Sequence, residues 1–444
     1  DGAGTGAGAR AMTGTAAANA GPAGPFADEP VPARPVVGEP VVGQTVTGLA
    51  AGFIGADGRL TPGVIAARAV VIAAGGLGQA FGTTSNPPGA TGDGIAIAAR
   101  AGAVIRDLEF VQFHPTVLWL PGASGQCPLI TEALRGAGAV LRDSDGAPLM
   151  AGHDPRGDLA PRDVVAARMA EVIGRGGANP GHVWLDATFL GREMLENGFP
   201  TVTAACRKHG IDPVTEMIPV APGAHYSCGG ILADLDGRTS LDGLYAAGEA
   251  ASTGVQGANR LASNSVTEAI IAGRRTGAAV AASLSATRAS ARPADDWAAV
   301  GRPGVGAPTA AAAAAAARPG GDAGEVDTEE TGVAAGRAAL AQAMSRHAGV
   351  IRDGDGLTRL LTVIAETSGA ACSLASAAPG VLDLESVEAA NLRAVSVLIA
   401  VGARRRAESR GCHRRRDAAD TASAPWHTLA RWDGHKLVVT KEAL

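Results

Sequence analysis

The order of hydrophobic and polar positions predicts strands and helices that alternate along most of the chain. Apolar residues run or alternate over 41–54 and 64–74 around the pair Asp57-Gly58, which predicts a hairpin followed by a buried strand. Helical spacing and short apolar runs then predict an α/β fold. The expected helices are 91–102, 128–138, 161–174 and one from about 263, and the expected strands are 183–186 and 244–247.

Helical spacing returns near the carboxyl end, where three segments are expected to form a three-helix bundle: 333–348, 355–367 and 383–407. Two stretches lack this patterning. Residues 1–40 are mostly Gly, Ala and Pro, so we expect them to be disordered. Residues 285–330 include the alanine run 310–317, which is typical of a linker, although alanines alone could also form a helix.

Composition narrows the function classes. The 444 residues carry a net charge of −5 and only 3% aromatic residues, which argues against a general nucleic-acid binder. The 5 cysteines form no C-x-x-C pair, so a disulfide framework, a metal site or an iron–sulfur cluster is not expected. We find no apolar run of about 18–20 residues and no secretory leader. A cytoplasmic protein with no membrane or nucleic-acid partner is predicted.

Several loops between the predicted elements carry arginine and histidine. His114, Arg162, His225 and Arg260 would bind a dicarboxylate if they converged, because guanidinium groups grip carboxylates bidentately. Each residue also has a simpler interpretation. A lone histidine is often a hydrogen-bonded core residue, and Arg162 could pair with the adjacent Asp163. Residues alone therefore indicate only an enzyme with an anionic ligand.

Five further positions could contact a flat cofactor or have only a structural role. Glu249 follows a short apolar strand, where its carboxylate could accept from a ribityl or ribose hydroxyl. Ser265 opens the next helix, so backbone N–H groups would face an electron-rich ring edge. Asp93 in T-G-D-G could contact the cofactor or only cap a helix, and Thr131 and Glu132 could be plain surface residues.

Several long sequence motifs, taken together, indicate a particular protein family. They occur in the order T-T-S-N-P-P-G-A-T-G-D-G, F-V-Q-F-H-P-T, L-I-T-E-A-L-R-G, L-A-P-R-D-V-V-A, H-Y-S-C-G-G-I, G-L-Y-A-A-G-E and G-A-N-R-L-A-S-N-S. The chain closely resembles the flavoprotein family of L-aspartate oxidase, succinate dehydrogenase and fumarate reductase. The S-N-P segment, the alanine in L-A-S-N-S and the short helical tail favour the oxidase branch.

The resemblance implies a reaction and a set of residues. FAD would oxidise L-aspartate to iminoaspartate and be reoxidised by oxygen or fumarate, at the start of quinolinate and NAD synthesis, with quinolinate synthase as a further partner. Arg162 matches the residue that the family uses for proton transfer. The substrate positions are Gln112, His114, Thr131, Glu132, His225 and Arg260, and the FAD positions are Asp93, Glu249, Ser265 and Val266.

The family also implies a domain plan. A partial FAD-binding, Rossmann-like domain would hold an inserted α+β capping domain and be followed by the helical domain. The expected ranges are 41–108 and 219–284 for the FAD-binding part, 109–218 for the capping domain, 285–330 for the linker and 331–444 for the helical domain.

One departure concerns the cofactor. The glycines at 2, 4, 6 and 8 do not make G-x-G-x-x-G, and no apolar strand precedes them, so the pyrophosphate loop is not found in this sequence. We therefore expect an amino-terminally truncated chain that binds FAD weakly or not at all. Two alternatives remain, a succinate dehydrogenase or fumarate reductase flavoprotein subunit and an inactive remnant of the oxidase.

Overall fold

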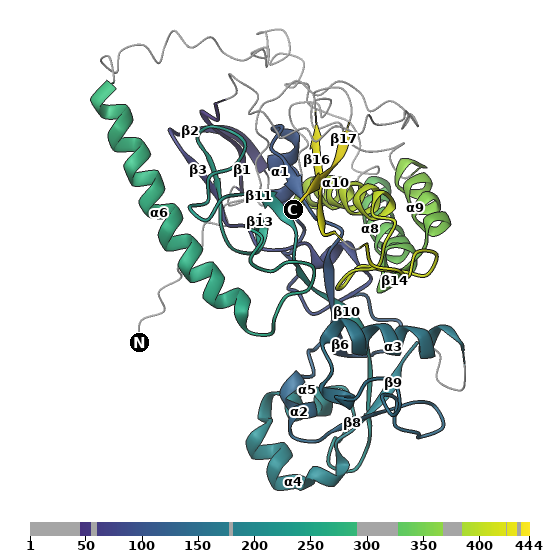
Figure 1. The fold of residues 1–444 in the computed structure, drawn as a ribbon. Helices are drawn as coiled ribbons and strands as arrows, with labels where there is room; N and C mark the ends of the chain where they lie inside the picture. The colour runs from purple at the N-terminus through teal and green to yellow at the C-terminus, as the bar shows by residue number, and fades with distance from the viewer. Residues whose placement is uncertain are drawn as a thin grey trace.

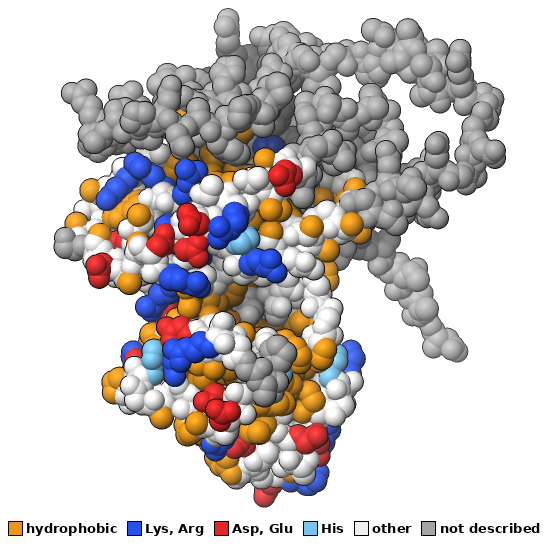
Figure 2. All heavy atoms as spheres, turned by 90° about the vertical axis from the view of Figure 1, so that its right-hand side faces the viewer, with side chains coloured by type: hydrophobic (Ala, Val, Ile, Leu, Met, Phe, Trp, Pro, Cys, Tyr) orange, Lys and Arg blue, Asp and Glu red, His pale blue; other side chains and the backbone are white. Residues whose placement is uncertain are grey.

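The computed structural model describes residues 45–54, 60–176, 181–290, 327–366, 384–422, 424–432 and 437–444. An upper body and a lower lobe are visible in Figure 1, and a narrow waist separates them in Figure 2. The low-complexity segment 1–40, most of 285–330 and the Asp57-Gly58 turn lie outside the described residues.

The upper body is built from short sheets. β3 (Val70–Ile72) and β12 (Leu244–Ala246) pair in parallel. This pairing joins a segment that precedes the lobe in the sequence to one that follows it. β1 (Gly48–Ile54) and β2 (Leu60–Ala66) form the predicted antiparallel hairpin. A further sheet has the strand order β13-β11-β5-β16-β17. Its strands are β5 (Ile105–Arg106), β11 (Gly230–Leu232), β13 (Ala251–Ser252), β16 (Trp426–Trp432) and β17 (Leu437–Ala443).

A mixed sheet of order β7-β4-β10-β9-β8, in which β6 also pairs with β10, extends from the upper body into the lower lobe. These two long strands cross the waist into the lobe (Figure 1). The strands are β4 (Thr83–Thr84), β6 (Val111–Leu118), β7 (Gly125–Gln126), β8 (Val140–Arg142), β9 (Val183–Asp186) and β10 (Ile218–Ser227). The helices are α2 (Glu132–Gly136), α3 (Arg162–Gly174), α4 (Gly191–Glu193), α5 (Pro200–Lys208), the 3-10 turns Gly157–Leu159 and Thr188–Leu190, and a π-helix Met194–Gly198.

Longer helices surround the upper sheets (Figure 1). α9 shows why the sequence folds this way, since Leu357, Leu360, Leu361 and Ile364 are buried at helical spacing and form one apolar face. The helices are α1 (Asp93–Arg100), α6 (Asn264–Ser290), α8 (Asp327–His347), α9 (Gly354–Glu366), α10 (Leu384–Arg405) and the 3-10 turns Gly78–Ala80 and Gly248–Ala250. The short parallel pair β14 (Ile351–Arg352) and β15 (Arg414–Arg415) links α9 to the segment after α10.

Two hydrophobic cores hold the molecule together. The first combines α1 and β5 with α8, α9 and α10, so the helical part and the sheets share one core. The second lies in the lobe between Leu118 and Val220. Burial of apolar side chains at about 25 cal/mol per Å² makes these clusters the main source of stability.

The predicted α/β class is confirmed, and three details differ from expectation. The helix expected at 128–138 covers only Glu132–Gly136, because 128–130 stay extended through backbone bonds to 116 and 118. α6 continues to Ser290, into the expected linker. The hairpin β16–β17 lies in the part expected to be helical. The domain boundaries stay a prediction.

α10 is a further departure from expectation. By length and apolar composition alone it could cross a membrane, although no such segment was expected. Half of its most apolar window is buried inside the protein, where it packs against α8, α9 and α1. Burial of this kind is typical of the core helix of a globular domain.

Candidate active site

The pairing of β6 with β10 brings the two candidate histidines together. His114 lies on β6 and His225 on β10, and their ring centroids are 5.2 Å apart. The register shifts between Ala224 and Tyr226, so His225 occupies a bulge opposite Gln112 and Phe113. Bulges re-aim side chains next to binding sites, and this one directs the imidazole toward the neighbouring strand.

Residues of the S-N-P segment hold His225 in place. Ser85 Oγ lies 2.7 Å from His225 Nδ1, and Asn86 Nδ2 donates to the His225 carbonyl at 2.9 Å. The Arg260 guanidinium can only donate, so the tautomer that fits both contacts accepts from it at Nε2 and donates from Nδ1–H to Ser85 Oγ. Sequence reasoning used this segment only to choose between family branches and did not place Ser85 in the site.

Arg260 comes from the loop before α6. Its Nη2 donates to Ser265 Oγ at 2.6 Å, and its Nη1 lies 3.5 Å from His225 Nε2. The guanidinium carbon sits 5.0 Å from the centre of the Tyr226 ring. Its Nε is buried and has no hydrogen-bond partner among the described residues. A buried, unsatisfied guanidinium N–H is costly, so this atom is a natural donor to an anionic ligand.

Arg162 lies at the first residue of α3. Its Nε donates to Glu132 Oε2 at 2.7 Å and its Nη1 to Gln112 Oε1 at 3.1 Å. Thr131 caps α2, because its hydroxyl accepts from the Ala133 amide at 3.3 Å. The structure thus groups Arg162, Glu132 and Gln112, and it uses Thr131 at least in part as a helix cap.

The electrostatic field of this cluster favours an anion. Burial, followed by the charges of Arg162 and Arg260, lowers the pKa of His225 to about 3. Burial and then His225 also lower the pKa of His114 well below its ordinary value. Both imidazoles are therefore neutral at pH 7 and add no charge, while the arginines supply the positive charge. His114 Nδ1 accepts from the Thr116 amide at 3.2 Å, so its proton lies on Nε2.

The low pKa of His225 makes one contribution to stability pH-dependent. The unfolded chain takes up this proton near pH 6.5 and the folded chain only near pH 3, so the contribution is full above 6.5 and is lost as pH falls. We expect the stability difference between wild type and His225→Gln to shrink by about 1.4 kcal/mol per pH unit below 6.5. Urea unfolding at pH 7.5 and 5.0 measures it. An unchanged difference would contradict the assignment.

The predicted FAD residues form a partly completed cradle. Burial raises the pKa of Glu249 to about 7, and its Oε1 accepts from the Ser227 amide at 2.9 Å. Gly76 lies against this carboxyl group, since a Cβ there would come within 2.1 Å of Glu249 Oε1. Val266 is 65% exposed on α6, where a flat ring could cover it.

Asp93 has different surroundings from the other three cofactor positions. Its carboxylate accepts from Thr91 Oγ1 and from Asn391 Nδ2, both at 2.7 Å, which ties α1 to α10. Its role toward FAD stays a prediction. Glu249, Ser265 and Val266 fit the cofactor by position and chemistry, since they offer a carboxyl group, a helix start and an apolar surface beside the arginine cluster.

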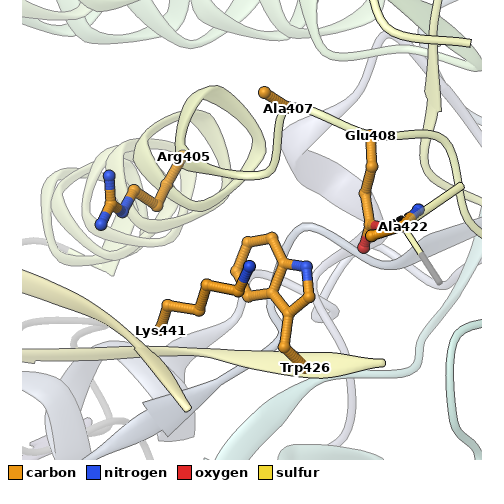
Figure 3. Close-up of a pocket in the computed structure, with 6 residues that line it drawn as sticks. All are labelled: Arg405, Ala407, Glu408, Ala422, Trp426 and Lys441. Atoms are coloured by element: carbon orange, nitrogen blue, oxygen red, sulfur yellow. Dashed lines mark hydrogen bonds between the residues drawn. The ribbon is translucent and has the colours of Figure 1, made fainter. Parts of the chain in front are cut away.

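A pocket of about 360 Å³ lies away from this cluster, beside the end of α10 (Figure 3). The Lys441 ammonium covers the Trp426 ring at 4.3 Å, and Glu408 already pairs with Arg406 and Arg410. Lys441 and Glu408 thus already have partners in this pocket. The arginine–histidine cluster is the better candidate for the active site. The lining residues are Arg405, Ala407, Glu408, Ala422, Trp426 and Lys441.

Comparison with known protein families identifies the family of this chain. Residues 33–266 match the FAD binding domain family, and residues 337–443 match the fumarate reductase flavoprotein C-terminal family. The first match spans more than half of the chain. The chain belongs to the FAD-binding flavoproteins of the succinate dehydrogenase and fumarate reductase family. The resemblance drawn from the motifs is confirmed, and FAD is the cofactor that this membership indicates.

Curated relatives narrow the comparison. The chain is 44% identical to L-aspartate oxidase of Streptomyces coelicolor over 377 residues, 83% of this chain and 60% of that protein. It is 45% identical to L-aspartate oxidase of Mycobacterium tuberculosis over 356 residues, 80% of this chain and 59% of that protein. The chain thus spans about three fifths of the length of these relatives.

Solved structures show the same fold. A quinol-fumarate reductase with menaquinol is 30% identical with a TM-score of 0.70, covering 90% of this chain and 70% of that one. Mycobacterium smegmatis Sdh1 is also 30% identical, with a TM-score of 0.67, covering 90% of this chain and 65% of that one. Among the described residues, no group of three His, Cys, Asp or Glu residues could hold a metal ion.

Proposed function

We propose that this chain carries the substrate site of a flavin-dependent L-aspartate oxidase, which forms iminoaspartate with oxygen or fumarate as the final acceptor. One observation carries the proposal. Arg260, with its unpartnered Nε, faces the neutral His225, whose ring lies beside that of His114. Arg162 lies on the other side of Gln112, which bonds to the Arg260 carbonyl. Such a cluster suits a small dianion, and curated relatives with this name are 44–45% identical to the chain.

The residues would divide the work of binding. Arg260 offers its unpartnered Nε–H to one carboxylate. His114 would donate to the substrate from Nε2–H, and neutral His225 lies beside Arg260 without repelling it. Arg162 has used its Nε and one Nη1 proton on Glu132 and Gln112, so its remaining N–H groups can face the substrate. Holding the α-carbon rigidly between fixed donors is worth several kcal/mol of barrier reduction.

FAD, when bound, would accept the hydride and with it the two electrons of the oxidation. Glu249, Ser265 and Val266 would hold it beside Arg260. Proton transfer by Arg162 rests on the family resemblance. The Glu132 carboxylate at 2.7 Å would stabilise the charged guanidinium between transfers.

A succinate dehydrogenase or fumarate reductase subunit is the competing function. It would use the same arginines and histidines, since succinate and fumarate are also dicarboxylates. Sequence similarity favours aspartate, because the solved quinol-fumarate reductase is 30% identical and the aspartate oxidases are 44–45% identical. Quinolinate synthase as a partner that consumes iminoaspartate, and a cytoplasmic location, stay predictions.

An anaerobic spectrum in excess FAD tests the proposal. We expect L-aspartate to bleach the flavin absorbance in the presence of the 444-residue chain, and succinate to leave it unchanged. Free FAD is kept in the cuvette, so weak binding does not prevent reduction. Bleaching by succinate would support the dehydrogenase alternative. A flavin that stays oxidised with both substrates would contradict activity in this chain and support the inactive-remnant alternative.

A further inference from the structure

A line of hydrogen bonds runs from the segment after α10 to the active-site cluster. Arg414 Nη2 lies 2.7 Å from Asp163 Oδ2, and Asn259 Nδ2 donates to Asp163 Oδ1, also at 2.7 Å. Gln112 Nε2 then donates to Asn259 Oδ1 at 2.8 Å. The line ends where Arg162 Nη1 donates to Gln112 Oε1 at 3.1 Å.

The directions of these bonds agree along the whole line. The Asp163 carboxylate can only accept, so the Asn259 side chain must present its NH₂ group to it. Asn259 then turns its oxygen toward Gln112, whose NH₂ group also donates to the Arg260 carbonyl at 2.6 Å. The Gln112 oxygen is left pointing at Arg162. Reversing either amide would set two donors against each other at one end and two acceptors at the other.

The segment that carries Arg414 is tightly fastened beside the same loop. Cys412 donates to the Ala258 carbonyl through its amide at 2.9 Å and its thiol at 3.0 Å. Gly411 has φ +52°, and a Cβ there would come within 2.3 Å of the Ala258 oxygen. Only glycine fits this close approach at positive φ. Ala258 immediately precedes Asn259 and Arg260, so the carboxyl-terminal segment fixes the loop that carries both.

Asp163 is well placed to act as the fixed point of the line. Its side chain is 9% exposed and is shared between Asn259 and Arg414, one oxygen each. It follows Arg162 directly at the start of α3, where a carboxylate also interacts favourably with the helix dipole. The adjacent residues therefore do different things: Arg162 faces the site and Asp163 faces the support.

We propose that Asp163, held by Arg414, is a positioning residue: it sets the orientation of the Asn259 amide, which holds Gln112 together with the Arg260 carbonyl and thereby places the Arg162 guanidinium. The inference rests on the proposed function for its consequence in turnover. The placement of Arg162 itself can be measured without substrate or flavin.

Exchanging the two partners tests the proposal. Asp163→Asn lets the amide flip and is expected to lower kcat on the order of 100-fold, with KM changed by less than about threefold, because a displaced catalytic group mainly costs rate. Asn259→Asp alone should also be impaired. The double variant Asp163→Asn/Asn259→Asp restores an acceptor-only group in the line. We therefore expect its kcat to be at least about tenfold higher than that of Asp163→Asn.

A spectroscopic readout separates this inference from the proposed function. The Nε–Hε signal of Arg162, assigned by its loss in Arg162→Lys, should shift in Asp163→Asn and return toward the wild-type position in the double variant. Asp154→Asn, which removes a carboxylate paired with the exposed Arg156, is the matched control and should leave the signal unmoved. If Asp163→Asn does not fold, Arg414→Gln takes its place and should give a smaller shift in the same direction.

The outcomes are decisive in either direction. An Arg162 signal that does not move in Asp163→Asn, or a double variant no better than the single ones, would overturn the positioning role. Wild-type chain that fails to oxidise aspartate would contradict the proposed function alone, and the Arg162 signal would still decide the role of Asp163.

Discussion

Replacing Arg260 by alanine is expected to weaken dicarboxylate binding by about 2 to 5 kcal/mol, or about 30- to 5000-fold in Kd. The reason is the position of the guanidinium. It is the side chain that joins His225, Ser265 and the Tyr226 ring, and its unpartnered Nε has no protein acceptor among the described residues. Its removal leaves the ligand charge without its closest neutralising fork. Isothermal titration with L-aspartate and with fumarate measures the loss.

Two variants sharpen this prediction. Arg260→Lys keeps the charge but loses the fork and the Nε donor, so we expect an intermediate affinity. Arg275→Ala removes an exposed arginine on α6 that pairs with Asp236, and it should bind like wild type. Unchanged affinity in Arg260→Ala would show that the anion site lies elsewhere.

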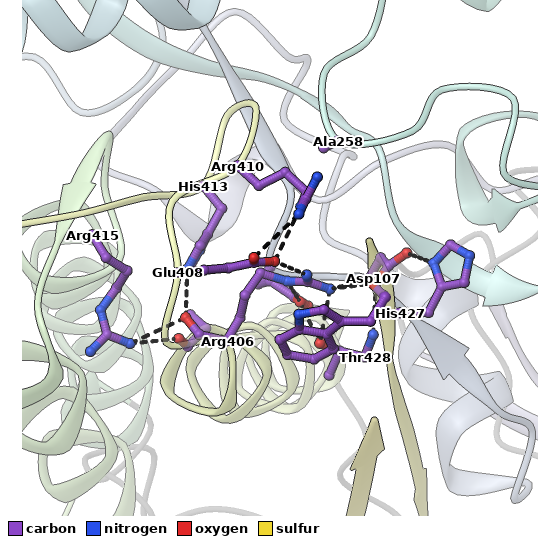
Figure 4. A network of polar contacts seen from close by, with 12 residues as sticks. Asp107, Ala258, Arg406, Glu408, Arg410, His413, Arg415, His427 and Thr428 are labelled. Atoms are coloured by element: carbon purple, nitrogen blue, oxygen red, sulfur yellow. Dashed lines mark hydrogen bonds and ion pairs between the residues drawn. The ribbon is translucent and has the colours of Figure 1, made fainter. Parts of the chain in front are cut away.

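Replacing Arg406 by methionine is expected to destabilise the fold by about 3 to 5 kcal/mol, because it leaves buried carboxylates without their cation. Figure 4 shows the network around this residue. Arg406 is buried and donates to Asp107 at 3.0 Å, Glu109 at 2.7 Å and Glu408 at 2.8 Å. Its guanidinium also lies 4.5 Å from the Phe110 ring centre and 4.0 Å from that of Trp426. Urea unfolding measures the change.

The controls distinguish lost charge pairing from lost packing. Arg192→Met removes an exposed pair with Glu196 and should leave the unfolding midpoint nearly unchanged. Burial already raises the pKa of Glu109, so adding Glu109→Gln to Arg406→Met should recover part of the lost stability. A loss below about 1 kcal/mol in Arg406→Met would contradict a structural role for the network.

The sequence predicted those parts of the fold that depend on local pattern. Amphipathic spacing was sufficient to predict α9, and the residues A-P-R-D indicated where α3 begins. The length of α2 was overestimated. Ile130, in the expected first turn, instead forms a backbone bond to Thr116 on a strand 14 residues earlier, which no local pattern reveals. The hairpin β16–β17 was missed for a similar reason, since its partner strand β5 lies over 300 residues away.

The candidate site was predictable as a set of residues and not as an arrangement. The motifs supplied His114, Arg162, His225 and Arg260, but the bulge that turns His225 inward depends on the register of β6 against β10. Ser85 and Asp163 carry no special spacing, and their roles arise from contacts with residues 140 and 96 positions away. Polar support of this kind becomes visible only when distant segments are placed side by side.

The pairing of β5 with β16 has a consequence for synthesis. The ribosome releases Ile105 and Arg106 long before Leu429 and Ala430, the residues that pair with them. During that interval the edge of β5 has no partner from the hairpin, and exposed strand edges invite pairing with other chains. The segment of Cys412 and Arg414 emerges equally late. A nascent chain therefore acquires its completed sheet and its supported Arg260 loop only after Ala430 has emerged.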